Sequence, residues 1–212
     1  MSTRTMGEPI ARREDPRLLS GQGHYLDDIG HTALAAAFVR SPHAHAQIVD
    51  IDVTDALDVD GLMAIYTHDD LPGRLAEPLP LLIPHPSLTH GRTPYALAKD
   101  EVNHVGEAIV MVVAVDRYLA EDACDRIRVE YDVRPPVVGI PSAREAARLV
   151  HDDVRGNVAA TMVQEHGDAT RAIAAASRVL ELDLEVERSA STPLEGKGVY
   201  ARWDPADASL RV

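Results

Sequence analysis

The sequence is poor in several residue types, and each shortage excludes a class of protein. A single cysteine, Cys124, excludes an internal disulfide framework, and we expect a reducing, cytoplasmic location. Aromatic residues make up only 4% of the chain, so the core must consist mainly of Val, Leu, Ile and Ala. No apolar run approaches the roughly 18 residues needed to span a bilayer, and the N-terminus has no apolar segment typical of a secretory signal.

Lysine and arginine are also scarce, which leaves a net charge of −13. Nucleic-acid binding is therefore not expected, because phosphate contacts need clustered cationic side chains. The ordinary interpretation of the acidic balance is solubility. The length of 212 residues and the hydrophobic fraction of 45% are typical of one large or two small globular domains.

Sequence signatures of the common catalytic sites are absent as well. The chain has no nucleophile elbow G-x-S-x-G, no HExxH and no CxxC. Gly21 and Gly23 predict a tight turn before a short strand, but they do not form a phosphate-binding loop. From the residues alone, no complete catalytic site is present.

The strongest pattern in the chain covers residues 105–133. The run from Ile109 to Val115 is apolar throughout, which favours a strand buried on both faces. Asp116 can cap a following helix to about Arg126, and residues 128–133 read as a second strand. The pattern predicts a compact βαβ unit.

Further elements are predicted on both sides of this unit. Proline spacing and the lack of periodicity predict a long loop at 72–98, of the kind that is often functional or faces a partner. Ser142 and Glu145 form a potential capping box for a short helix. The remaining expected elements are strands at 34–39, 47–53, 61–67, 179–188 and 198–203, a helical turn capped by Thr54, a helix at 168–177 capped by Asp168, and a strand starting at Ser209.

The predicted strand at 179–188 alternates apolar and acidic residues without a fault. This period of two is typical of a half-buried strand whose acidic side faces solvent or a basic partner. The strand starting at Ser209 has only four residues to the end of the sequence, with little to pair with. We therefore expect the sequence to stop inside a domain whose remainder lies elsewhere.

Histidine and glutamate residues are the candidates for chemistry. His43 and His45 would share one face of a strand, so a metal pair is conceivable, although a structural role at a strand junction is favoured. Glu107 and Glu195 could act as an acid or base if burial raised their pKa, and capping or pairing with arginine is the alternative for each. The other residues considered are expected to lie at the surface or to pack: His85, His90, His104 and Cys124.

Four ordered motifs give the chain a family resemblance. GQGHYLDDI at 21–29, FVRSPHAHAQIVDID at 38–52, the stretch 105–138 and PLEGKGVYARWD at 193–204 resemble the start of a molybdenum hydroxylase large subunit. This is the superfamily of xanthine dehydrogenase, aldehyde oxidase and carbon monoxide dehydrogenase. The resemblance implies an α+β fold: an α/β hammerhead domain with a mixed sheet, followed by the start of the molybdopterin-binding domain. It implies a division into an N-terminal arm at 1–20, the hammerhead at 21–150 and the incomplete second domain at 151–212.

The resemblance also implies the chemistry of the assembled enzyme. Such enzymes hydroxylate an aldehyde, an N-heterocycle or CO at a molybdopterin-bound molybdenum with oxygen from water, and electrons pass through [2Fe–2S] clusters to FAD. The catalytic glutamate and the cofactor loops of the family lie beyond the motifs found here, so no catalytic, cofactor-binding or metal residue is assigned to this chain. We expect a structural portion that binds no cofactor alone and needs the remaining molybdopterin domain and iron–sulfur and FAD partners. A non-catalytic interaction module is the alternative, and a small metal hydrolase that uses the histidines is the third hypothesis.

Overall fold

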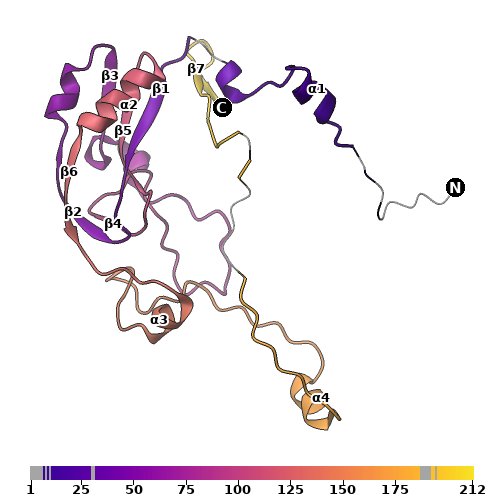
Figure 1. Ribbon diagram of the computed structural model, residues 1–212. Helices are drawn as coiled ribbons and strands as arrows, with labels where there is room; N and C mark the ends of the chain where they lie inside the picture. The colour runs from indigo at the N-terminus through magenta and orange to yellow at the C-terminus, as the bar shows by residue number, and fades with distance from the viewer. Residues whose placement is uncertain (1–6, 8, 10, 30–31, 187–191, 194) are drawn as a thin grey trace. The chain divides into compact units, whose positions relative to one another are not determined.

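The computed structural model describes residues 7, 9, 11–29, 32–186, 192–193 and 195–212. These residues form two compact units (Figure 1). We call residues 34–180 the sheet unit, and the described residues of 7–33 and 181–212 the terminal unit. The two units are described separately.

The first sheet of the sheet unit is built around the strand that the apolar run predicted. Strand β5 (Ala108–Ala114) lies between β1 (Ala35–Arg40) and β3 (Leu62–Tyr66), and both neighbours pair with it in antiparallel register. Adjacent residues Ile109 and Val110 are both fully buried, so the strand is covered on both faces as expected.

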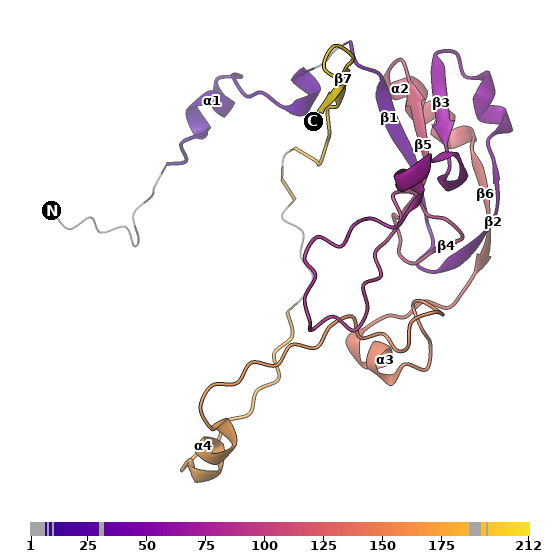
Figure 2. The same ribbon diagram turned by 180° about the vertical axis from the view of Figure 1, so that it is seen from behind.

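The second sheet has the order β4-β2-β6, again with antiparallel pairing. Its strands are β4 (Glu101–Val102), β2 (Ala46–Asp52) and β6 (Arg128–Val133). One hydrophobic core serves both sheets and helix α2 (Arg117–Arg126), which contacts β1, β5 and β3 (Figure 2). Its buried members are Ala46, Ala56, Val59, Ala98, Val102, Ile109, Val110, Val112, Ala123 and Ile127.

The α+β class is therefore confirmed, and two of its predicted details, the βαβ unit and the mixed sheet, are wrong. Strand, helix and strand follow one another at 108–133 as expected, but β5 and β6 belong to different sheets. The segment is consequently not a βαβ crossover within one sheet, and the strand pairs of the described residues are antiparallel rather than mixed. Periodicity identifies elements and their buried faces, but it does not identify the strands that they pair with.

Helix caps give a mixed outcome. Asp116 accepts a hydrogen bond from the Leu119 amide at 2.9 Å, and Asp168 accepts one from the Arg171 amide at the start of α4 (Ala169–Ala175), so both predicted caps are confirmed. The capping box at Ser142 is wrong. Helix α3 (Ile140–Glu145) starts earlier, after Gly139, because Pro141 already occupies its first turn.

Short 3-10 helices occupy several of the remaining connections. Thr54 begins η2 (Thr54–Asp58) but does not cap it, because Val53 stands at the N-cap without a side-chain cap bond and the Thr54 amide donates to Asp52. The predicted strand at Tyr25 is instead the turn η1 (Leu26–Asp28). Residues 72–98 are irregular as predicted, apart from η4 (Gly73–Ala76), and η3 (His68–Asp70) precedes them.

The predicted strand at 179–188 is not formed in the described residues 179–186. Both of its faces are exposed, and the apolar side is as open as the acidic side. Alternation specifies a strand only where a sheet and a core receive it, and no strand of the described chain pairs with this segment. Residues 187 and 188 lie outside the described residues.

The terminal unit contains α1 (Asp15–Leu19), η1 and a two-stranded sheet. Strand β7 (Arg202–Asp204), shorter than predicted, pairs with β8 (Ser209–Arg211) through the expected turn. The expectation that the Ser209 strand would have little to pair with is therefore wrong. Part of the N-terminal arm predicted at 1–20 lies outside the described residues.

Candidate functional site

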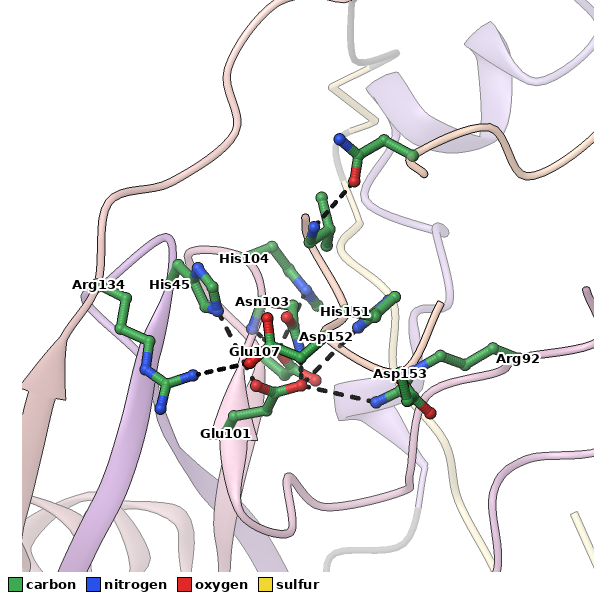
Figure 3. Close-up of polar contacts among 12 residues, drawn as sticks. His45, Arg92, Glu101, Asn103, His104, Glu107, Arg134, His151, Asp152 and Asp153 are labelled. Carbon is green, nitrogen blue, oxygen red and sulfur yellow. Dashed lines mark hydrogen bonds and ion pairs between the residues drawn. The ribbon is translucent and has the colours of Figure 1, made fainter. Parts of the chain in front are cut away.

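A polar cavity of about 420 Å³ lies within the sheet unit, between the Pro-rich loop, β4 and the segment after α3. Figure 3 shows the polar side chains around it. Its walls are formed by Arg92, Thr93, Pro94, Tyr95, Ala98, Lys99, Asp100, Glu101, Asn103, His104, Glu107, Val150 and His151.

Glu101, at the start of β4, is the centre of the polar contacts (Figure 3). One carboxylate oxygen lies 3.6 Å from Nη2 of Arg92 and 3.8 Å from Nδ1 of His151. The same oxygen, Oε1, lies 3.5 Å from Nδ2 of Asn103. The other carboxylate oxygen, Oε2, lies 3.9 Å from Nε2 of His45. We call these five residues the Glu101 cluster.

The contacts within the Glu101 cluster are long, and one of them is a hydrogen bond, which the Asn103 side chain donates to Glu101. His45 Nε2, His151 Nδ1 and Asn103 Oδ1 are buried and have no hydrogen-bond partner among the described residues. Distances of 3.8 and 3.9 Å from the imidazole nitrogens to the carboxylate are too long for hydrogen bonds. The cluster thus presents two unsatisfied imidazole nitrogens to one carboxylate.

The second carboxylate of the cavity, Glu107, has a structural role. Its carboxylate accepts a hydrogen bond of 2.6 Å from the backbone amide of Asn103 and lies 3.4 Å from Nδ1 of His104. Its backbone oxygen accepts from the Ser41 amide, and the Arg40 side chain donates to the Gly106 carbonyl. The neighbours of the Glu107 carboxylate are thus the Asn103 backbone and a histidine rather than the predicted arginine, and the motif at 40–45 holds the turn that carries it.

His43 and His45 lie in the turn before β2, not in a strand, so their predicted placement on one strand face is wrong. The ring of His43 packs edge-on against Tyr131 at 4.8 Å. His45 is buried, and its Nδ1 lies 3.5 Å from the Pro135 carbonyl. The described residues contain no group of three or more His, Cys, Asp or Glu side chains arranged to hold a metal ion.

The segment after α3 is fastened to the sheet unit by side chains on either side of His151. The Asn157 amide nitrogen donates to the carbonyls of Ala143 and Arg148, and its oxygen accepts from the Val150 amide. Asp153 binds Arg92, and Asp152 lies 3.5 Å from Arg134. These contacts place His151 against Glu101.

Burial is the largest cause of a shifted pKa at three side chains in this unit, those of His151, Cys124 and Tyr131, and it raises the pKa of Tyr131. The pKa of His151 is lowered, first by burial and then by the Arg92 guanidinium, while Glu101 and Asp153 oppose the shift. Burial, with smaller contributions from Asp125 and Glu121, raises the pKa of the Cys124 thiol to about 11. Cys124 therefore holds its proton at neutral pH, as expected for a packed cysteine.

The remaining predicted residues make local contacts or join sequence motifs. His85 Nδ1 contacts the Ser87 hydroxyl at 2.8 Å, and His90 Nδ1 accepts from the Arg92 amide. In the terminal unit, Glu195 accepts a hydrogen bond of 2.5 Å from the Leu26 amide, which joins two of the sequence motifs. Sequence reasoning missed Arg92, Glu101 and His151, because they stand in irregular or very short elements that have no periodic signal.

The cavity does not fit a molybdopterin dinucleotide. Such a cofactor is a large polyanion, whereas the cavity walls include three carboxylates, those of Asp100, Glu101 and Glu107. The guanidinium that could bind phosphate, that of Arg92, is already paired with Glu101 and Asp153.

In the part of the chain that the structure describes, no helix is long and apolar enough to cross a membrane.

Comparison with known families divides the chain into two matched regions. Residues 20–135 match the model of the aldehyde oxidase and xanthine dehydrogenase a/b hammerhead domain. Residues 150–212 match the molybdopterin cofactor-binding domain. The cavity therefore includes residues from the first matched region and, through Val150 and His151, from the start of the second.

Individual relatives match nearly the whole chain. The chain is 34% identical to the 6-hydroxypseudooxynicotine dehydrogenase complex subunit gamma and 33% identical to the nicotine 6-hydroxylase large subunit, both of Paenarthrobacter nicotinovorans. Each comparison covers 98% of this chain and 26% or 25% of the relative. The structure of quinoline 2-oxidoreductase from Pseudomonas putida 86 matches 95% of this chain and 25% of its own, with 33% identity and a TM-score of 0.79. The chain thus spans about a quarter of the length of these relatives.

Proposed function

The chain belongs to the aldehyde oxidase and xanthine dehydrogenase family of molybdenum hydroxylases, and on this premise we propose that it is the N-terminal structural portion of a hydroxylase large subunit. One observation carries the proposal. Two family models match in the order that a large subunit requires, and a solved relative superposes on 95% of the chain. The proposed division is an arm at 1–20, the hammerhead domain at 21–150 and the start of the cofactor-binding domain at 151–212.

The proposed reaction of the assembled enzyme is hydroxylation of an aromatic N-heterocycle. Two relatives that match nearly the whole chain carry nicotine or quinoline in their names. Aldehydes and CO are the alternative substrates within the family. When bound, the molybdenum cofactor would supply oxygen transfer from water and accept the electrons, which would leave through iron–sulfur and FAD partners.

This chain's own contribution to the reaction is structural. The motif at 40–45 binds the turn of Gly106 and Glu107 through hydrogen bonds from Arg40 and Ser41, and Glu195 ties the motif at 193–204 to Leu26. The cofactor and the catalytic glutamate are proposed to be held by the remainder of the large-subunit polypeptide. The chain would therefore support catalysis by shaping and joining domains, with no catalytic, cofactor-binding or metal residue of its own.

The proposal is tested by assembly with the remaining large-subunit polypeptide and the iron–sulfur and FAD subunits. We expect a complex that contains molybdenum and converts quinoline or nicotine to a product with oxygen from labelled water. Omission of residues 1–212 should abolish turnover. CO and an aldehyde serve as comparison substrates. A chain that never associates with such a polypeptide would contradict the proposal and support the non-catalytic interaction module.

A further inference from the structure

We propose that the Glu101 cluster is a pH-sensitive clasp, which holds residues 148–157 against the sheet unit while His151 is neutral and releases them in mild acid. The clasp rests on contacts within the sheet unit and does not depend on the proposed function. It joins four residues inside the hammerhead match to His151, which lies at the start of the cofactor-binding match. It would therefore control how firmly these two regions are joined.

The charges of the cluster balance only when His151 is neutral. Inside the cavity Glu101 faces Arg92, and because these side chains are 22% and 30% exposed, one partly buried anion meets one partly buried cation. Asp153 also binds Arg92, but the Asp153 side chain is 69% exposed, and water screens its charge. A proton on His151 would add a second cation beside Arg92, and both would face the same carboxylate oxygen of Glu101.

Burial of His151 decides whether acid strengthens or weakens the docking of residues 148–157. The pKa of His151 lies below its usual 6.5 because burial, the largest cause, and Arg92 disfavour the charged ring. A histidine with a lowered folded-state pKa contributes stability that is fully present above its unfolded pKa. That stability is lost as the pH falls from 6.5 towards the lowered value. Acid therefore weakens the docked state.

His151 is well placed to transmit this effect to its neighbours. The adjacent Val150 amide donates to Asn157, and the two following carboxylates bind Arg134 and Arg92. Movement of the His151 ring away from Glu101 would therefore pull on three contacts of the same segment. The other titratable or charged groups around the cavity are His45, Lys99, Asp100, His104 and Glu107.

Hydrogen exchange of the full chain tests the proposal. Protection of the backbone amides at 148–157, corrected for the intrinsic effect of pH on exchange, is compared between about pH 7.5 and about pH 5.5, which bracket the usual histidine pKa. We expect protection to fall at least about threefold in acid. The amides of β5 serve as the internal reference and should keep their protection.

Three variants separate His151 from other causes. His151→Asn keeps a side-chain donor near the position of Nδ1 and cannot titrate, so its protection at 148–157 should not respond to pH. His166→Asn removes an exposed histidine and should respond as the wild type does. Glu101→Gln removes the anion that favours the charged ring, so the midpoint of the response should move to lower pH.

Each outcome has a defined meaning. An unchanged acid response in His151→Asn, or a response abolished by His45→Asn alone, would overturn the proposal. If His151→Asn loosens the segment at every pH, the Glu101→Gln variant decides. A displaced midpoint then supports the clasp, and an unmoved midpoint overturns it.

Discussion

Gly61 and Gly106 both have a backbone conformation that side chains disfavour, but their surroundings differ. Their φ angles are +81° and +90°. A Cβ atom on Gly61 would lie 2.7 Å from Val115 Cγ2 and 3.0 Å from Leu119 Cδ1, whereas one on Gly106 would meet no atom within 4 Å. A substitution at Gly106 therefore tests backbone strain alone, and one at Gly61 tests backbone strain together with steric overlap.

We predict that Gly61→Ala destabilises the fold more than Gly106→Ala. The left-handed conformation costs both variants about 1–2 kcal/mol. Gly61→Ala also forces apart β3 and α2 at a packed contact, which adds about 1–3 kcal/mol. Urea unfolding followed by circular dichroism measures both values. Equal losses in the two variants would mean that the contact at Val115 relaxes freely.

At the scale of single residues, the sequence predicted burial better than partnership. Cys124 was expected to pack, and it is half-buried with a raised pKa. Glu107 was left with two interpretations, and only coordinates could show that the Asn103 amide and His104 occupy its carboxylate. The partners of Glu101 come from positions 45, 92 and 151, and no pattern along a chain reports contacts of such separation.

At the scale of elements, α2 and α4 provide a matched pair of helix caps. Asp116 and Asp168 each accept a hydrogen bond of 2.9 Å from an amide three residues later. Helix α2 buries Ala120 and Ala123 against the sheet, but α4 has no buried residue. The same cap therefore supports a packed helix in one case and an exposed helix in the other.

We predict that Asp116→Ala lowers the free energy of unfolding of the sheet unit by about 1 kcal/mol. Asp168→Ala should loosen α4 without changing that value, because an exposed short helix contributes little to the core. Urea unfolding gives the first quantity, and amide exchange at 169–175 gives the second. A global loss in Asp168→Ala would show that α4 packs in solution.

The elements that the sequence predicted well are those whose signal is local. The apolar run at 109–115 predicts a buried strand, and the carboxylates at 116 and 168 predict helix starts, because burial and capping depend on residues only a few positions apart. Pairing does not have this property. The βαβ prediction failed because β5 and β6 found different sheets, and the strand predicted at 179–188 failed in its described part because alternation alone supplies no neighbour.

At the scale of the whole molecule, the segment 179–186 is where the fold and the proposed function meet. Leu180, Leu182 and Leu184 are 90%, 79% and 86% exposed, although their spacing places them on one face of an extended strand. Burying three leucines would contribute on the order of 5 kcal/mol. A proposed large subunit about four times as long offers the polypeptide that could receive them.

We predict that amides 179–186 exchange quickly in this chain alone and become protected when the chain assembles with the remaining large-subunit polypeptide. Alternation then acts as it does in any half-buried strand, with the leucines inward and Glu181, Asp183 and Glu185 outward. The double variant Leu182→Ser with Leu184→Ser should weaken assembly by at least about tenfold, measured by titration calorimetry. Asp183→Asn with Glu185→Gln alters only the outward face, so it should assemble nearly as the wild type does. An active assembly in which these amides still exchange quickly would show that the leucine face has no partner in the enzyme.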